Sequence, residues 1–284
     1  MPGGKHWVRL RLGWMGHKVR RKNKRRYDEA LTAGPCAPTI VACPQTTYAR
    51  SHVGLCSKDW MLDMALKELD YDQVQAYMEA LVPPRPAELA AMEEQAREHD
   101  FPIIGPVCGQ ACYQIARLIK ARRIFELGSG YGYSTAWFAR AVQENCADAG
   151  AGVAGEVHHV VWDEELSQEA RGHLTTLGYD GVVHYHLGEA VDELRKSSGD
   201  FDIVFNDIDK HGYPASLPVI AEKLRPGGVL IIDNMLWHGR IFQPDDRRPD
   251  TLGVHEVTRM LATDPAWTVS LLPLRDGMLV AQKR

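Results

Sequence analysis

Between residues 123 and 233, short apolar runs alternate with stretches of helical periodicity, and this alternation limits the folds that the chain can adopt. The apolar runs cover 123–127, 157–162, 182–187, 201–206 and 228–233. The helical stretches lie near 134–143, 164–177, 189–196 and 214–224. Strands that alternate with helices in this way form a parallel sheet that is covered by helices on both faces.

The last two apolar runs break the alternation. Runs at 267–273 and 277–282 are separated only by the short turn Leu274–Gly277. A turn this short cannot cross over between parallel strands, but it can close an antiparallel hairpin. The sequence therefore predicts an α/β fold with a mostly parallel, seven-stranded sheet that ends in an antiparallel hairpin.

Helices are expected before the sheet. The first, ended by Pro83, carries an apolar face at helical spacing, made of Val74, Tyr77, Met78 and Leu81. A second helix is expected over 86–98. A third would bury one face, made of Ala111, Ile115, Leu118 and Ile119.

Residues 1–57 differ from the rest of the chain in composition. Residues 1–27 hold ten Lys or Arg and no acidic residue, and 28–57 show no sustained period. We interpret 1–57 as a disordered basic extension and 58–284 as one folded domain. The alternatives for the extension are an arm that binds nucleic acid or a membrane surface, or an Arg-rich transit peptide. The basic run lacks the interleaved aromatic residues that base stacking would use.

Charge, hydropathy and cysteine usage narrow the partners. A formal net charge of -4 gives no general attraction to nucleic acid or to anionic membranes. No apolar run approaches the roughly 20 residues of a membrane helix, and the start lacks the apolar core of a secretory signal. The six cysteines follow no metal-site spacing and are expected to be free thiols. We therefore expect a cytoplasmic protein with neither nucleic acid nor membrane as a partner.

A glycine-rich loop joins the first strand to the helix that follows it. Gly128, Gly130 and Gly132 form the spacing G-x-G-x-G, whereas the dinucleotide fingerprint would place a small residue where Tyr133 stands. Glycines here allow a tight turn and a close approach to a ligand. Glu126, just before the loop, suits the cationic amino group of S-adenosylmethionine better than a pyrophosphate. A purely structural turn is the alternative.

Three oxygen-bearing side chains follow two strands that should be neighbours. Asp207 ends the fourth strand, and Asp233 and Asn234 end the fifth. Ligands gather at the carboxyl ends of strands in an open parallel sheet. Two carboxylates and one amide oxygen suit Mg²⁺, or else Mn²⁺ or Ca²⁺. The alternative is that these residues only cap a helix and form a turn.

Four motifs, in the same order, resemble those of the cation-dependent O-methyltransferases typified by catechol O-methyltransferase and caffeoyl-CoA O-methyltransferase, especially their small bacterial relatives. The likeness covers roughly residues 64–284. Its carriers are ELGSGYGYS at 126–134, NDIDKHGY at 206–213, LRPGG leading to DNMLW within 224–237, and LPLRDG at 272–277. The resemblance implies a Rossmann-like class I methyltransferase fold with S-adenosylmethionine as cofactor, so that 58–284 would be the methyltransferase domain. It also implies a homodimer.

The resemblance implies which residues bind the cofactor. Gly128 and its loop would hold the methionine portion, with Ser134 near the carboxylate. The family commonly places an acid where Val161 stands; here Asp163 would take its role toward the ribose and Trp162 would cover the adenine. The full set is Ile104, Glu126, Gly128, Ser129, Gly130, Tyr131, Ser134, Trp162, Asp163, Glu189, Ala190 and Asp207.

The chemistry to be catalysed is deprotonation and methylation of a hydroxyl on a small molecule. A phenol with a pKa of about 10 is largely protonated at neutral pH, and a bound dication both acidifies and orients a coordinated hydroxyl. Two adjacent hydroxyls, as in a catechol, could chelate the ion together. Lys210 matches the family's catalytic lysine, and a nearby dication disfavours its ammonium form, so that it can act as general base. Tyr213 and Trp237 are expected to border the acceptor.

Two other functions stay open at this stage. One is a methyltransferase of the same fold that needs no metal. The other is a non-catalytic protein that binds S-adenosylmethionine. A chelator would distinguish the first, because it would leave activity intact. The presence of Lys210, Asp207 and Asp233 together argues against the second, since binding alone requires neither a metal nor a base.

Overall fold

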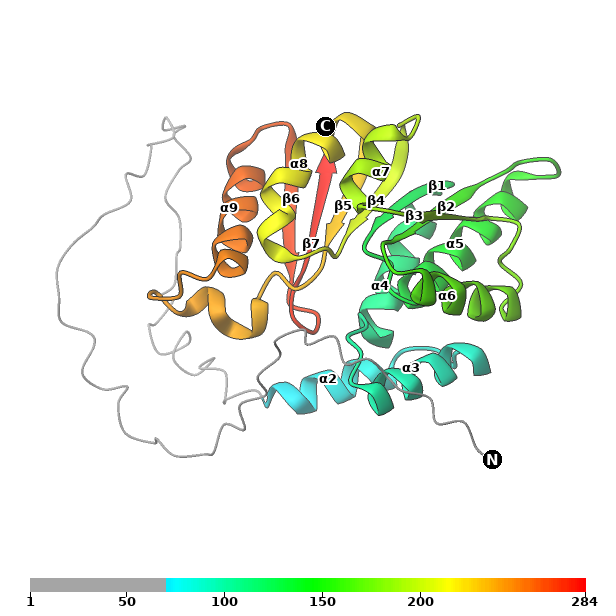
Figure 1. Ribbon diagram of the computed structural model, residues 1–284, viewed down its shortest axis with the longest axis horizontal. Helices are drawn as coiled ribbons and strands as arrows, with labels where there is room; N and C mark the ends of the chain where they lie inside the picture. The colour runs from blue at the N-terminus through cyan, green and yellow to red at the C-terminus, as the bar shows by residue number, and fades with distance from the viewer. Residues whose placement is uncertain (1–69) are drawn as a thin grey trace, which may run out of the picture. The chain divides into compact units, whose positions relative to one another are not determined.

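A computed structural model describes residues 70–284, and the expected basic extension, residues 1–57, lies outside the described residues. In the described part, seven strands form one sheet in the order β3-β2-β1-β4-β5-β7-β6 (Figure 1). The strands are β1 (Arg123–Leu127), β2 (Glu156–Val161), β3 (Val183–Leu187), β4 (Phe201–Asn206), β5 (Leu224–Ile232), β6 (Trp267–Leu272) and β7 (Met278–Lys283). Strands β1 to β5 pair in parallel, and β7 is antiparallel to both β5 and β6. The predicted sheet and its terminal hairpin are confirmed.

Helices cover both faces of this sheet. They are α2 (Tyr71–Ala80), α3 (Ala87–His99), α4 (Gly105–Leu118), α5 (Tyr133–Ala149), α6 (Glu164–Thr176), α7 (Ala190–Lys196), α8 (Tyr213–Lys223) and α9 (Pro249–Thr263), with the short helices η1 (Lys210–Gly212) and η2 (Trp237–Phe242). Figure 1 shows α4, α5 and α6 grouped apart from α7, α8 and α9. No helix within residues 70–284 combines the length and apolarity needed to cross a membrane.

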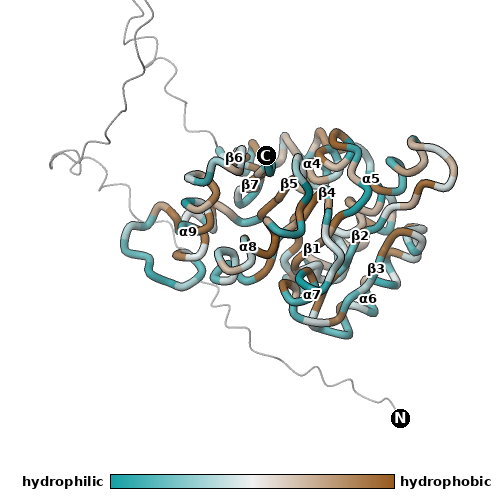
Figure 2. Tube along the Cα trace, turned by 90° about the horizontal axis from the view of Figure 1, so that it is seen from above, coloured by the Kyte–Doolittle hydropathy of each residue, from teal (hydrophilic) through white to brown (hydrophobic). Residues whose placement is uncertain are grey.

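The alternation of side chains along each strand divides the buried residues into two cores. Ile124 on β1 belongs to the core that α3 to α6 complete, and its neighbour Phe125 belongs to the core under α7 to α9. This is the period-two pattern of a strand buried on both faces. In Figure 2 the strands run through hydrophobic stretches of the trace. The sheet is therefore a rigid centre, and its loops can carry a site.

The predicted helices differ from the observed ones in which face is buried. Helix α2 buries none of its residues, and Tyr77 and Leu81 are 68% and 66% exposed. Helix α4 packs through Cys108, Cys112 and Ala116, whereas Leu118 in its last turn is 75% exposed. Small side chains allow α4 to lie close to α5, so the longer apolar residues beside them are only partly covered. The described cysteines are free thiols, as predicted.

Candidate active site

Strand register brings the predicted site residues to one edge of the sheet. Leu127, Asn206 and Ile232, the last residues of β1, β4 and β5, are paired partners across the three adjacent strands. The next residue in each case is a predicted site residue: Gly128, Asp207 or Asp233. The backbone amide of Asp207 donates to the Leu127 carbonyl at 2.9 Å, and that of Asp233 donates to the Asn206 carbonyl at 3.3 Å.

The glycine loop needs its glycines for two separate reasons. Gly128 has a φ of +86°, and a Cβ there would lie 2.7 Å from the carbonyl oxygen of Asp207. Gly130 has a φ of +52° and lies against the Phe101 ring, 3.3 Å from where its Cβ would be. The Ser129 hydroxyl accepts from the Val160 amide at 2.9 Å, which ties the loop to β2. A side chain at 128 would separate the loop from the strand end that carries Asp207.

Glu126 lies beneath this loop and is fully buried. The Thr135 hydroxyl donates to one carboxylate oxygen, and the other oxygen, Oε1, has no hydrogen-bond partner among the described residues. Burial raises the pKa of Glu126 to about 7, against the opposing effect of the Ser134, Thr135 and Ser129 hydroxyls. An unpaired buried oxygen of this kind favours a cationic or hydrogen-donating partner.

The remaining predicted cofactor residues fall into two groups. Tyr131 and Ser134 are buried in and beside the glycine loop, and Ile104 is buried at the start of α4. The Tyr131 hydroxyl donates to the Met92 carbonyl on α3 at 2.8 Å. Trp162, in contrast, is 83% exposed at the carboxyl end of β2. Its indole is therefore largely open to solvent.

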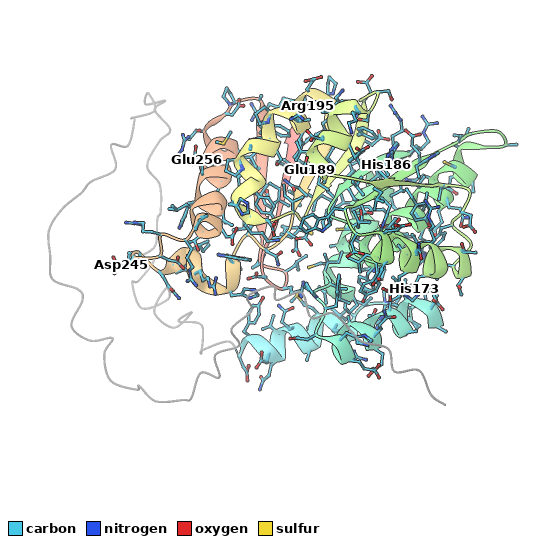
Figure 3. All side chains as sticks on the ribbon, in the orientation of Figure 1. His173, His186, Glu189, Arg195, Asp245 and Glu256 are labelled. Atoms are coloured by element: carbon cyan, nitrogen blue, oxygen red, sulfur yellow. The ribbon has the colours of Figure 1, made fainter. Side chains whose placement is uncertain are left out.

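Two predicted cofactor residues, Asp163 and Glu189, also cap helices, a role that was not predicted from the sequence. Asp163 caps α6, accepting from the amides of Glu165 at 2.8 Å and Leu166 at 3.1 Å. Glu189 caps α7 by accepting from the amide of Asp192 at 2.7 Å, and it precedes the half-buried Ala190 (Figure 3). Such a cap can be recognised in a sequence as an acidic residue just before a helix, followed by further acidic residues in the first helical turn.

Three charged side chains gather at this edge of the sheet, those of Asp207, Asp233 and Lys210. Lys210 Nζ donates to Asp207 Oδ1 at 2.7 Å and to the Ile208 carbonyl at 3.2 Å. Asp233 is only 2% exposed, and its Oδ1 has no hydrogen-bond partner among the described residues. Burial, and then the charge of Asp207, raise the pKa of Asp233 to about 7, although Arg275 acts against this.

The donor set fits a hard divalent cation. Residues 70–284 contain no group of three or more His, Cys, Asp or Glu side chains that could by itself hold a metal ion. The predicted set, however, has two carboxylates and the amide of Asn234, which has a φ of +59° and whose Nδ2 donates to Asp276 at 3.4 Å. That hydrogen bond leaves the amide oxygen of Asn234 as the free acceptor. The unpaired oxygen of Asp233 and the two adjacent carboxylates call for positive charge.

The two predicted acceptor residues occupy different environments. Trp237 is half-buried, with its ring centre 5.9 Å from Lys210 Nζ. Tyr213 is fully buried, and its hydroxyl donates to the Asp233 carbonyl at 2.9 Å. In this structure Tyr213 therefore supports the end of β5 from the core and offers no surface to an acceptor. This position differs from the prediction that Tyr213 borders the acceptor.

Helix α9, which the sequence analysis did not predict, holds the lysine turn. Asp250 Oδ1 accepts from the His211 amide at 3.0 Å and lies 2.9 Å from His211 Nδ1. Gly253 lies one turn further along, and a Cβ there would be 2.2 Å from the Lys210 carbonyl oxygen. Pro249 after Arg248, followed by apolar residues at helical spacing, is the signal that could have revealed this helix.

Comparisons with known proteins agree on one family. The sequence model of the family described as O-methyltransferase matches residues 89–284. A catechol O-methyltransferase of Niastella koreensis is 27% identical over 222 residues, which is 74% of this chain and 96% of that protein. The catechol O-methyltransferase domain-containing protein 1 of Mus musculus is 34% identical over 179 residues, covering 61% of this chain and 65% of that protein.

Solved structures give the same relationship. The O-methyltransferase TomG of Streptomyces achromogenes, involved in tomaymycin synthesis and solved with S-adenosylmethionine, superposes with a TM-score of 0.65 at 28% identity. The superposition covers 74% of this chain and 96% of that protein.

Proposed function

The chain belongs to the O-methyltransferase family, and we propose that it uses a divalent cation to transfer the methyl group of S-adenosylmethionine to a hydroxyl of a small, catechol-like acceptor. The observation that carries the proposal is the meeting of Asp207, Asp233 and Asn234 at adjacent strand ends, with Lys210 in contact with Asp207.

The glycine loop is the proposed binding site of S-adenosylmethionine. The left-handed glycines and the near contact of Gly128 with Asp207 leave backbone exposed where a side chain would otherwise stand. Glu126 is fully buried beneath the loop, so its carboxylate supports a cationic ligand in this region through its charge and not through a surface contact. Trp162 supports a flat group at the end of β2, because its indole is exposed rather than packed. We propose that the remaining residues of the expected cofactor set also contact S-adenosylmethionine.

Asp207, Asp233 and Asn234 are the proposed ligands of the cation, with Mg²⁺ the best match to an all-oxygen set. A bound dication would acidify a coordinated hydroxyl and hold two adjacent hydroxyls in one orientation. The resulting preference for neighbouring hydroxyls is the reason for proposing a catechol-like acceptor.

Lys210 is the proposed general base. Its amine accepts the proton of the acceptor hydroxyl, the hydroxyl oxygen bonds to the methyl carbon, and the carbon–sulfur bond breaks with its electron pair remaining on sulfur. The contact of Lys210 Nζ with Asp207 at 2.7 Å holds the base beside the proposed ligands. Trp237 would border the acceptor ring.

The decisive experiment measures transfer of labelled methyl from S-adenosylmethionine to catechol, with Mg²⁺ and after exhaustive chelation. We expect turnover only with the metal, and we expect Asp233→Asn to lose it while still binding the cofactor. Asp148→Asn is the matched control, because Asp148 pairs with Arg117 near the end of α5, which runs away from the strand ends. Full turnover after chelation would favour a metal-independent methyltransferase, and cofactor binding without transfer to any hydroxyl would favour a non-catalytic protein.

Two further expectations remain proposals. We propose that residues 58–284 form the methyltransferase domain and that 1–57 add nothing to catalysis. We also propose a homodimer. The exposed apolar side chains of Tyr77 on α2 and of Leu81, the residue that follows α2, support it, since a partner could cover them. Light scattering on the purified chain would show a mass of either one or two copies.

A further inference from the structure

Arg275 stands in an unusual position between β6 and β7. Its φ is +49°, a left-handed conformation that is uncommon for a residue with a side chain. Its side chain is 41% exposed. Among residues 70–284, the only carboxylate within 4 Å of its guanidinium is that of Asp233, at 3.8 Å, which is too long for a direct hydrogen bond. Backbone strain of this kind is found where the surrounding structure holds a residue for a task.

Arg275 lines a cavity of about 390 Å³ next to the proposed metal ligands. Two aromatic residues, Tyr71 and Phe242, line it together with Leu236 and His238. The link between the cavity and the strand end is Arg275 itself, since its guanidinium lies 3.8 Å from the carboxylate of Asp233. The aromatic walls and the size of the cavity suit a single substituted ring.

The neighbouring acid does not neutralise Arg275. Asp276 also lines the cavity, but it is only 9% exposed and already accepts from the His238 amide at 2.6 Å and from Asn234 Nδ2 at 3.4 Å. Its carboxylate is therefore directed at the backbone that shapes the cavity. The group left to meet a ligand is the planar guanidinium of Arg275, whose fork of donors matches a carboxylate.

We propose that the methyl acceptor carries an anionic group, a carboxylate attached to its catechol-like ring, and that Arg275 binds this group in the cavity. The proposal rests on the proposed function, since it concerns the acceptor of that same site. Arg275 is then a specificity-determining residue: it selects the acceptor by charge and orients the ring with its hydroxyls toward Asp233 and Lys210.

The test compares three catechols at saturating S-adenosylmethionine and Mg²⁺. They are protocatechuate, which has a ring carboxylate; its neutral primary amide; and dopamine, which has an ammonium group. We expect kcat/KM to be on the order of 10-fold to 100-fold higher for protocatechuate than for the amide, the range expected of a charge-assisted hydrogen bond, and lowest for dopamine. In Arg275→Gln the ratio should fall to about one, and Arg275→Lys should keep part of it.

A control variant separates contact from general charge. Arg240→Gln removes a positive charge from η2, where Arg240 stacks on Trp237, and it should keep the preference for protocatechuate. Calorimetry of protocatechuate and its amide on the Mg²⁺ complex with S-adenosylhomocysteine gives a second readout, in which Arg275→Gln should weaken only the acid.

The outcomes distinguish the two proposals. Turnover of catechols without any preference for the acid, or an unchanged ratio in Arg275→Gln, overturns the role of Arg275. An effect of Arg275→Gln confined to the Mg²⁺ dependence also overturns it, because Arg275 would then be only a counter-charge for Asp233. If no catechol is methylated, the proposed function fails instead, and the calorimetric comparison alone decides whether Arg275 binds a carboxylate.

Discussion

Gly253 on α9 lies so close to the carbonyl oxygen of Lys210 that a Cβ at position 253 would be 2.2 Å from that oxygen. A methyl group does not fit at this distance, and the Lys210 carbonyl oxygen belongs to the backbone and cannot rotate away. The absence of a side chain in the second turn of α9 therefore sets where the turn that carries Lys210 can lie.

Gly253→Ala should consequently impair catalysis more than stability. We expect the lysine turn to be displaced and kcat to fall by on the order of 10²-fold, the effect of a misplacement of about 1 Å, while the affinity for S-adenosylmethionine stays unchanged. The matched control is Gly172→Ala on α6, where a Cβ would meet nothing within 4 Å. Steady-state kinetics with cofactor calorimetry would test this, and an unaltered kcat in Gly253→Ala would refute the positioning role.

Lys210→Ala should slow the chemical step while sparing the cofactor and the metal. The expected loss is on the order of 10² to 10⁴ in kcat, the usual contribution of a general base. Raising the pH should partly restore turnover of a phenolic acceptor, because solvent then supplies the deprotonated oxygen. Single-turnover measurements from neutral to alkaline pH would detect this rescue. Wild-type rates in Lys210→Ala at neutral pH would remove the lysine from the mechanism.

Gly128→Ala should abolish binding of S-adenosylmethionine. The added Cβ would lie 2.7 Å from the Asp207 carbonyl oxygen, at a φ of +86° that is already unfavourable for a side chain. Gly181→Ala, in the turn before β3 where a Cβ would meet nothing within 4 Å, is the control. Calorimetry gives the answer directly, and an unchanged dissociation constant in Gly128→Ala would contradict the assignment of the loop.

The strand ends could be predicted from the sequence because they depend on local signals. Apolar runs of strand length fixed the positions of Asp207 and Asp233, and parallel pairing then brought them to one edge. The contact of Gly253 with Lys210 could not be predicted in this way. It joins residues on separate elements, and it depends on how closely α9 packs on η1.

The orientation of individual side chains could not be predicted from the sequence either. The motif predicts where Tyr213 lies along the chain, but not which way its side chain points. In the structure the side chain points into the core, where its hydroxyl donates to the Asp233 carbonyl. Arg275 was identified only as part of a turn and of the motif at 272–277, because its approach to Asp233 requires β7 to pair with β5.

Deleting residues 1–57 should leave methyl transfer unchanged. The reason is that the residues proposed for the cofactor, the metal and the base all lie between positions 104 and 234. Activity and thermal unfolding of the shortened chain, compared with the full chain, would measure the effect. Loss of activity with retained folding would show that the basic extension takes part in the reaction.

Each of two histidines on β2 should lower the free energy of unfolding in mild acid. Burial lowers the pKa of His159 to about 3 and that of His158 to about 4. In the unfolded chain a histidine has a pKa of about 6.5, so below that pH the unfolded chain binds more protons than the folded one. Each histidine therefore contributes its full stabilisation above pH 6.5 and loses it as the pH falls toward the pKa of the folded state. Glu126 and Asp233 act in the opposite direction, because the pKa of each is raised to about 7, so the pH dependence of the wild type alone does not test the histidines. Urea unfolding of His159→Gln at pH 7 and pH 5 isolates the histidine. The unfolding free energy at pH 7 minus that at pH 5 should be about 2 kcal/mol lower in the variant than in the wild type, at about 1.4 kcal/mol per pH unit. His255→Gln, at an exposed position on α9, should keep the wild-type difference. An identical difference in His159→Gln and the wild type would mean that His159 can be protonated in the folded protein at no cost.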